Sequence, residues 1–116
     1  METDDRSGRR VAVARVEDVP DGSMKMVQVD GTDILLVNQE GLHALQGTCS
    51  HEYFELDKGF LTAGSVTCAL HLSRFDLISG ESLDPPADLP LARFPAAIED
   101  GQIVLSLPAG EIRINE

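Results

Sequence analysis

The chain has 116 residues, 42% of them hydrophobic, and these values predict one soluble domain with a single buried core. Its 20 acidic and 9 basic side chains give a formal net charge of −11, which argues against binding to nucleic acid or to an anionic membrane surface. No apolar run approaches the roughly 18 residues of a membrane-spanning helix. The first residues have no apolar stretch like that of a secretory signal, so we expect residues 1–9 to form a loose tail and the protein to be cytoplasmic.

The N-terminal half has the pattern of short antiparallel strands. Residues 9–16 and 23–29 alternate apolar side chains with polar or small ones, which is typical of a half-buried strand. Residues 32–38 form a more continuously apolar run. The Asp30-Gly31 pair before this run is a strong signal for a two-residue hairpin turn. A further strand is predicted over residues 41–47.

The C-terminal half continues the same pattern. Strands are predicted over residues 65–71, over 74–82 with a Ser-Gly turn, and over 92–108 with a hairpin closed at an Asp-Gly pair. The segment PPADLP at 85–90 cannot be an interior strand because proline donates no ladder hydrogen bond. We expect it to be a fixed loop that either connects two sheets or covers the neighbouring site. No window of helical period is present, so the predicted fold class is all-β.

Both cysteines of the chain lie close to a histidine. Cys49 and His51 are separated by one residue, and Cys68 and His71 by two, in a chain with 2 cysteines and 3 histidines. Such a placement is improbable by chance, so we predict that these residues form one site. The third histidine, His43, has no cysteine nearby, and we expect a structural or surface role for it.

Three interpretations of the Cys/His pairs compete. A disulfide between Cys49 and Cys68 would not persist in a reducing compartment and would leave the histidines unexplained. A structural zinc site would accept these ligands, but zinc folds usually pair like with like along the chain, whereas each loop here carries one of each. A two-iron cluster explains the mixing, because each loop can send its cysteine to one iron and its histidine to the other. That is the arrangement of a Rieske [2Fe–2S] centre.

The order CSH at 49–51, sixteen intervening residues, and CALH at 68–71 resembles the Rieske motif C-x-H-x16-17-C-x-x-H. Residues 10–107 resemble the Rieske-type ferredoxins of bacterial aromatic ring-hydroxylating dioxygenase systems. The resemblance implies a Rieske fold, in which an antiparallel β-sandwich or barrel-like basal domain carries a small cluster-binding subdomain, here about 47–86. It also implies one [2Fe–2S] cluster, with the ligands Cys49, His51, Cys68 and His71.

The function implied by this resemblance is one-electron transfer, so we expect a carrier and not an enzyme in its own right. A flavin-containing reductase supplied by NAD(P)H would reduce the cluster, and a terminal oxygenase would accept the electron from a monomeric carrier. Two alternatives stay open. One is a Rieske ferredoxin of a monooxygenase or another oxidoreductase complex. The other is a zinc-stabilised binding domain without redox chemistry.

Departures from related Rieske proteins point to the low-potential branch. The high-potential proteins of respiratory complexes carry two further cysteines that link the cluster loops, and the matching positions here are Phe54 and Leu70. Those proteins also have a serine and a tyrosine after the last histidine; here Ser73 is present but Phe75 replaces the tyrosine. Leu72 stands where many relatives have glycine, which affects the expected backbone of that loop.

Two smaller expectations concern residues near the ligand loops. Three acidic residues could form a docking rim or a merely solvated face: Glu52, Glu55 and Asp57. Three glycines are expected to occupy turns that need positive φ: Gly47, Gly59 and Gly64.

Overall fold

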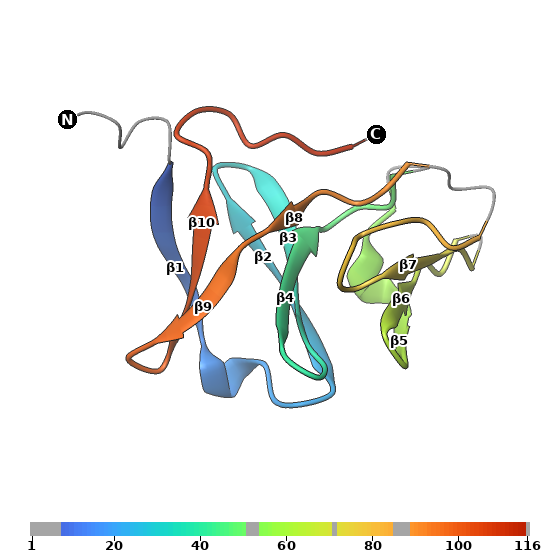
Figure 1. The fold of residues 1–116 in the computed structure, drawn as a ribbon, viewed down its shortest axis with the longest axis horizontal. Coiled ribbons are helices and arrows are strands. Elements are labelled where there is room, and N and C mark those ends of the chain that lie inside the picture. The colour runs from blue at the N-terminus through green and yellow to red at the C-terminus, as the bar shows by residue number, and fades with distance from the viewer. Residues whose placement is uncertain (1–7, 51–53, 71, 85–88, 116) are drawn as a thin grey trace.

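The computed structural model describes residues 8–50, 54–70, 72–84 and 89–115 (Figure 1). Within these ranges the chain forms antiparallel strands in three sheets, and helix is limited to two 3₁₀ turns at Val16–Asp18 and Leu56–Lys58. The prediction of an all-β fold is therefore confirmed. None of the helical turns in the described residues is long and apolar enough to cross a membrane.

The three sheets divide the chain into a basal part and a smaller part. The first sheet has the order β1 (Arg9–Arg15), β10 (Gln102–Leu107) and β9 (Ala96–Glu99). The second sheet has the order β2 (Ser23–Val29), β3 (Thr32–Asn38), β4 (Leu42–Gln46) and β8 (Arg93–Phe94). The third sheet has the order β5 (Phe60–Thr62), β6 (Ser65–Thr67) and β7 (Arg74–Asp76). The first two sheets, called the basal sheets below, lie to one side in Figure 1 and the third sheet lies beyond them.

The second sheet is the wall shared by two cores. Ile34 and Leu36 on β3 pack into the core formed with the first sheet, whereas Leu35 and Val37 pack into the core formed with the third sheet. All four side chains have 0% exposure. Successive residues of a strand point to opposite faces, so β3 is buried on both sides. This double burial explains why its sequence is an apolar run without polar alternation.

The two Asp-Gly pairs form the hairpin turns that the sequence predicts. Asp30 and Gly31 have φ values of 53° and 81°, and Asp100 and Gly101 have 52° and 77°. Positive φ at both central residues is characteristic of the type I′ turn, whose twist matches that of the flanking strands. The register of β2 with β3 and of β9 with β10 follows from these turns.

The structure corrects several predicted boundaries. Arg9 is the first residue of β1 and pairs with Leu107, so the tail predicted over 1–9 ends earlier, and residues 1–7 lie outside the described residues. β6 ends at Thr67 because the chain turns into a loop there. β5 was not predicted, since a strand of three residues is too short to show a period. Of the predicted loop 85–90, only Leu89 and Pro90 are described, and both lie outside strands.

Two of the three glycine expectations are wrong. Gly64 has a φ of 78°, as expected, but Gly47 and Gly59 are not among the glycines with positive φ. Instead, both positions need glycine because neighbouring atoms lie where a Cβ atom would be. A Cβ atom on Gly47 would lie 2.5 Å from Met26 Sδ, and one on Gly59 would lie 1.8 Å from the carbonyl oxygen of Thr67. Any side chain at Gly59 would therefore displace the backbone that leads into Cys68.

Candidate metal centre

The two cysteines lie in one core, at the points where two strands end. Cys68 directly follows β6, and Cys49 follows β4 after two intervening residues. Their exposed fractions are 6% for Cys49 and 1% for Cys68, and both pack in the core between the second and third sheets. They are not joined by a disulfide. Sequence positions 49 and 68 are thus brought into the same small apolar region.

Each cysteine begins a loop, and the two loops are closed by the same type of backbone hydrogen bond. The N–H of Cys49 donates to the carbonyl of Phe54, and the N–H of Cys68 donates to the carbonyl of Ser73, each at 2.9 Å. Both bonds join a cysteine to the residue five positions later. The two loops therefore enclose residues of equal number, 50–53 and 69–72, although the cysteine-to-histidine spacings differ. The sequence alone did not reveal this equivalence.

The two predicted histidine ligands, His51 and His71, lie outside the described residues, as does Glu52. Each histidine belongs in sequence to one of the two closed loops. The assignment of all four ligands therefore stays a prediction, supported on the cysteine side by the shared core. The third histidine, His43, is placed differently. Its ring Nε2 lies 3.2 Å from the carbonyl oxygen of Gln39, within hydrogen-bonding distance. This contact is in keeping with the structural role expected for it.

The donor set fits a metal–thiolate centre. Two cysteines with almost no solvent access and no mutual disulfide place their sulfur atoms in a protected apolar region, and a metal deprotonates a coordinating thiol. With one histidine in each loop, the set becomes two sulfur and two nitrogen donors, which suits a Rieske [2Fe–2S] cluster. The same four donors would also satisfy zinc, so donor chemistry by itself leaves that alternative open.

The second loop contains a leucine in a left-handed backbone conformation. Leu72 has a φ of 62°, and its N–H donates to the carbonyl of Cys68 at 2.8 Å. A residue with a Cβ in this conformation is disfavoured by roughly 1–2 kcal/mol. The loop backbone is thus the one that glycine would adopt, even though this chain carries leucine. The side chain of Leu72 is 62% exposed, so burial within the chain does little to offset that cost.

An ion pair holds the start of β7 to the segment that follows the third sheet. Arg74 Nε lies 2.7 Å from Asp84 Oδ2, and the backbone N–H of Arg74 donates to the same oxygen at 3.1 Å. The Arg74 guanidinium holds the pKa of Asp84 below its ordinary value. Hydrogen bonds from the backbone and hydroxyl of Ser79 lower the pKa of Asp76 in the same way. Both carboxylates therefore remain ionised around neutral pH.

Two polar residues that the sequence analysis did not single out support the first loop. Ser50 is buried, and its hydroxyl donates to the carbonyl of Leu89 at 2.5 Å. Gln46, at the end of β4, is completely buried and its side chain donates to the carbonyl of Thr48 at 2.9 Å. The available signal was a glutamine directly after the apolar pair Ala44 and Leu45, because an amide that is buried there must be hydrogen-bonded.

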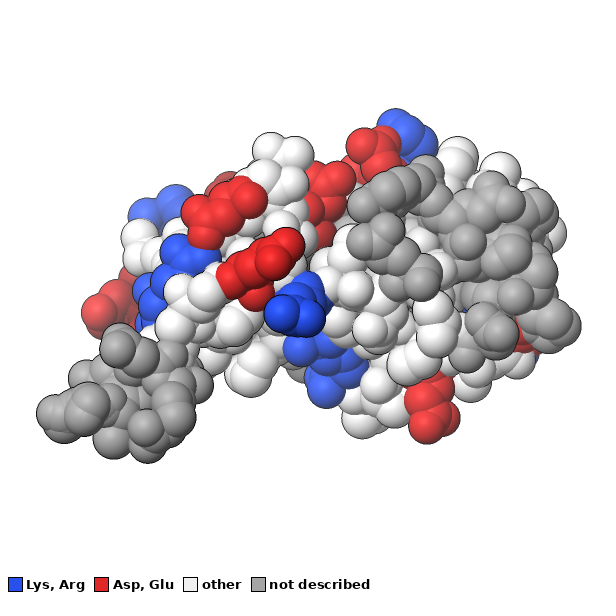
Figure 2. All heavy atoms as spheres, turned by 90° about the horizontal axis from the view of Figure 1, so that it is seen from above, with Lys and Arg blue, Asp and Glu red and all other residues white. Residues whose placement is uncertain are grey.

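The surface near the ligand loops has both charged and apolar side chains. Figure 2 shows charged side chains of both signs over the basal sheets. Of the two described residues of the predicted acidic rim, Glu55 pairs with Lys58 at 3.2 Å and Asp57 is exposed. Among the described residues, most exposed large apolar side chains belong to the part that carries the ligand loops: Phe60, Leu70, Leu72, Ile78, Leu83 and Leu89. An apolar surface of this kind is common where a protein contacts a partner.

Comparison with known proteins shows a consistent set of similarities. Residues 9–95 match the model of the Rieske [2Fe-2S] domain family. The chain is 31% identical over 98 residues to the ferredoxin component of the naphthalene 1,2-dioxygenase/salicylate 5-hydroxylase systems of Ralstonia sp, covering 84% of this chain and 94% of that protein. It is 35% identical over 97 residues to the ferredoxin component of the alkene monooxygenase system of Xanthobacter autotrophicus, covering 82% and 79%. The solved ferredoxin of carbazole 1,9a-dioxygenase from Nocardioides aromaticivorans superposes with a TM-score of 0.79 at 27% identity, covering 85% and 97%.

Proposed function

The chain belongs to the Rieske [2Fe–2S] domain family, and on that premise we propose that it is the electron-carrying ferredoxin of a multicomponent oxygenase system. The observation that carries the proposal is the pair of buried cysteines, each at the start of a loop closed by the same hydrogen bond. The relatives are named as ferredoxin components of oxygenase systems, so the protein is a carrier and the oxygenase performs the catalysis.

The residues proposed to hold the cluster are Cys49 and Cys68 through sulfur and His51 and His71 through ring nitrogen. When bound, a cluster of this type accepts and releases one electron. The protein contributes a dry environment for the two sulfur atoms and two closed loops that limit their movement. The proposed cluster-binding subdomain, residues 47–86, is supported by the position of the third sheet and of both cysteines on the same side of the second sheet.

The proposed electron donor is a flavin-containing reductase supplied by NAD(P)H, and the proposed acceptor is the terminal oxygenase of an aromatic-ring dioxygenase system. Support comes from relatives named as components of naphthalene and 3-phenylpropionate/cinnamic acid dioxygenases. The second candidate is a monooxygenase system, favoured by the 35% identity to the alkene monooxygenase ferredoxin. In either case the carrier is proposed to be cytoplasmic and monomeric, and Phe54, Leu70 and Phe75 favour a low reduction potential.

Metal analysis of the freshly purified native protein tests the proposal. About two irons and two inorganic sulfides per chain are expected, with visible absorption that bleaches on reduction and the electron spin resonance of a histidine-ligated cluster. His71→Ala should lose this signal, whereas His43→Ala, which changes the histidine of β4, should keep it. Stoichiometric zinc without iron or sulfide would overturn the proposal in favour of a non-redox binding domain.

Reconstitution separates the two oxygenase classes. The reduced carrier is mixed with the terminal oxygenase of an aromatic-ring dioxygenase system or with that of an alkene monooxygenase system, and the rate of electron transfer is measured. Faster transfer to the dioxygenase is the expected result. A preference for the monooxygenase would transfer the assignment to the second candidate.

A further inference from the structure

Asn115, in the C-terminal segment 111–115, is hydrogen-bonded to one buried side chain of the interior. The N–H of Asn115 donates to Gln46 Oε1 at 2.9 Å, and the carbonyl of Asn115 accepts from Gln46 Nε2 at 2.7 Å. Gln46 has 0% exposure. The two bonds run in opposite directions between the same pair of residues, so they fix both the backbone N–H and the carbonyl of Asn115. The segment lies beyond residues 9–95, the part matched by the family model.

Gln46 connects this segment to the first ligand loop. Its Oε1 also accepts from the N–H of Ala92 at 2.7 Å, and its Nε2 also donates to the carbonyl of Thr48 at 2.9 Å. An amide side chain has two donor hydrogens and two acceptor positions, so the hydrogen-bonding capacity of Gln46 is fully used. Thr48 immediately precedes Cys49. Gln46 thus holds the backbone on one side of the first cysteine.

A second route from Asn115 reaches the other side of that cysteine. The side-chain Nδ2 of Asn115 donates to the carbonyl of Pro90 at 2.7 Å. The adjacent residue, Leu89, accepts the hydroxyl hydrogen bond of Ser50 at 2.5 Å. Ser50 immediately follows Cys49. The two routes from Asn115 therefore end at positions 48 and 50, on either side of the first proposed sulfur ligand.

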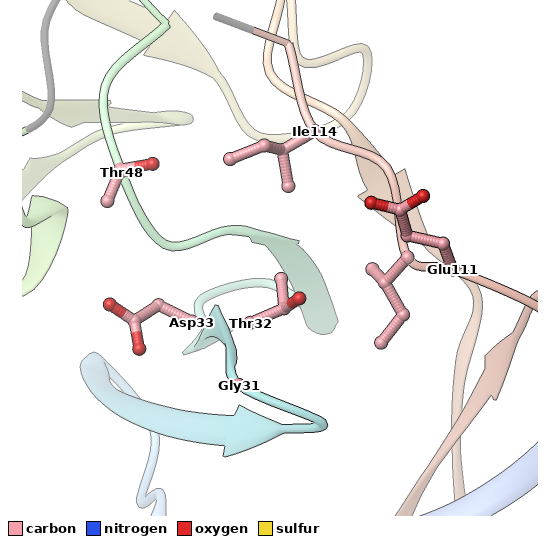
Figure 3. Close-up of a pocket in the computed structure, with 7 residues that line it drawn as sticks. Gly31, Thr32, Asp33, Thr48, Glu111 and Ile114 are labelled. Carbon is pink, nitrogen blue, oxygen red and sulfur yellow. The ribbon is translucent and has the colours of Figure 1, made fainter.

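The segment borders a cavity on one side and contributes one side chain to the core. A cavity of about 250 Å³ lies between the segment, the Gly31–Asp33 turn and Thr48 (Figure 3). In Figure 3, Glu111 and Ile114 of the segment lie on one side of this cavity, and Thr32 and Asp33 at the start of β3 lie on another. Ile112 is buried in the basal core. Ile112 therefore anchors the start of the segment, and the bonds of Asn115 hold its far end beyond the cavity.

We propose that Asn115 and Gln46 are positioning residues for the first ligand loop, and that segment 111–115 is a buttress that fixes the backbone on both sides of Cys49. The inference rests on the proposed function, since it assigns Cys49 to the cluster. Loosening the buttress should let the loop move relative to the second loop. The consequences should be a changed electronic environment of the cluster and a faster loss of iron.

The test uses the cluster-bearing full chain, four single variants and one double variant. Asn115→Ala removes the bond to Pro90, and Ser50→Ala removes the bond to Leu89. Gln46→Met removes all four hydrogen bonds of the Gln46 side chain without adding a charge. Arg113→Ala is the matched control, because it changes an exposed residue of the same segment. Measurements are the electron spin resonance of the reduced protein, its reduction potential, the rate of iron transfer to a chelator, and the midpoint of thermal unfolding.

Asn115→Ala is expected to release iron about fivefold faster, the factor that corresponds to about 1 kcal/mol for one hydrogen bond. Its reduction potential and spin resonance should shift as well, and those of Gln46→Met should shift further, whereas Arg113→Ala should match the wild type. In the double variant Ser50→Ala/Asn115→Ala, the shift should be smaller than the sum of the single shifts, because both changes break the same route.

Unchanged spin resonance and potential in Asn115→Ala and Gln46→Met, with only a lower unfolding midpoint, would overturn the inference and leave the segment with a purely stabilising contact to the basal sheets. That result is distinct from failure of the proposed function. A wild-type protein that contains no iron would refute the carrier function itself and this inference with it.

Discussion

Phe75 offers a direct test of how close β7 lies to the proposed cluster ligands. Its side chain has 0% exposure and packs in the core that contains Cys49 and Cys68. By the resemblance to high-potential Rieske proteins, this is the position of a tyrosine whose hydroxyl donates toward the cluster. Phe75→Tyr therefore adds one hydroxyl, with no access to water, beside the proposed sulfur ligands.

The added hydroxyl either donates to a ligand sulfur or stays without an acceptor, and the two cases change different quantities. If it reaches a ligand sulfur, it stabilises the more negative reduced form by roughly 1 kcal/mol. That energy corresponds to a rise of about 40 mV, since about 1.4 kcal/mol is about 59 mV for one electron. If it finds no acceptor, an unsatisfied buried hydroxyl lowers the stability by about 1–3 kcal/mol. In a domain of this size, each kcal/mol lowers the unfolding midpoint by roughly 4–8 °C.

Protein-film voltammetry, which measures the reduction potential, and thermal unfolding, which measures stability, distinguish the two cases. We expect the potential of Phe75→Tyr to rise by about 40 mV with little loss of stability. Phe94→Tyr is the matched control, because Phe94 is buried in the other core, the one formed with the first sheet. The reduction potential of the Phe94→Tyr protein should equal that of the wild type. An intact cluster with an unchanged or lower potential in Phe75→Tyr would refute the placement of this side chain beside the ligand sulfurs.

Two further predictions follow from the close packing behind the second loop and from the net charge. Gly59→Ala should lower the free energy of unfolding by about 2 kcal/mol and speed cluster loss, because its Cβ would lie 1.8 Å from the Thr67 carbonyl just before Cys68. Gly110→Ala, which meets no atom within 4 Å, should change neither, and a Gly59→Ala protein as stable as the wild type would contradict the close approach. With a net charge of −11, the rate of electron transfer from the reductase should fall as salt shortens the Debye length from about 30 Å at 0.01 M to about 8 Å at physiological strength. A rate that stays flat in stopped-flow mixing would assign docking to the exposed apolar side chains near the ligand loops.

The local features of this protein could be predicted from its sequence because their causes are local. The Asp30-Gly31 turn follows from residues that tolerate positive φ, and the alternation in 23–29 follows from the two faces of a strand. The spacing of Cys49 with His51 and of Cys68 with His71 carried the cluster prediction, because a mixed pair in each loop suits two irons better than one zinc.

Other features depend on which surfaces meet after folding. Gly59 owes its identity to Thr67, which approaches it across the β5–β6 pairing, so the expectation of a positive φ was wrong there. The apolar run 32–38 reflects a sheet with cores on both sides, which no local pattern reveals. The equal closure of the two ligand loops likewise depends on the backbone geometry that each cysteine adopts.

The contact between Gln46 and Asn115 shows this distinction most clearly. The sequence by itself determined the fold class, the hairpin turns and the cysteine–histidine pattern, because neighbouring residues encode turns and strands through their own backbone preferences. Only the tertiary structure decided that residue 115 would be bonded to residue 46 and reach both sides of Cys49. The physical reason is that a buried amide must find partners wherever the packed chain presents them, and those partners are set by the arrangement of the sheets and not by adjacent residues.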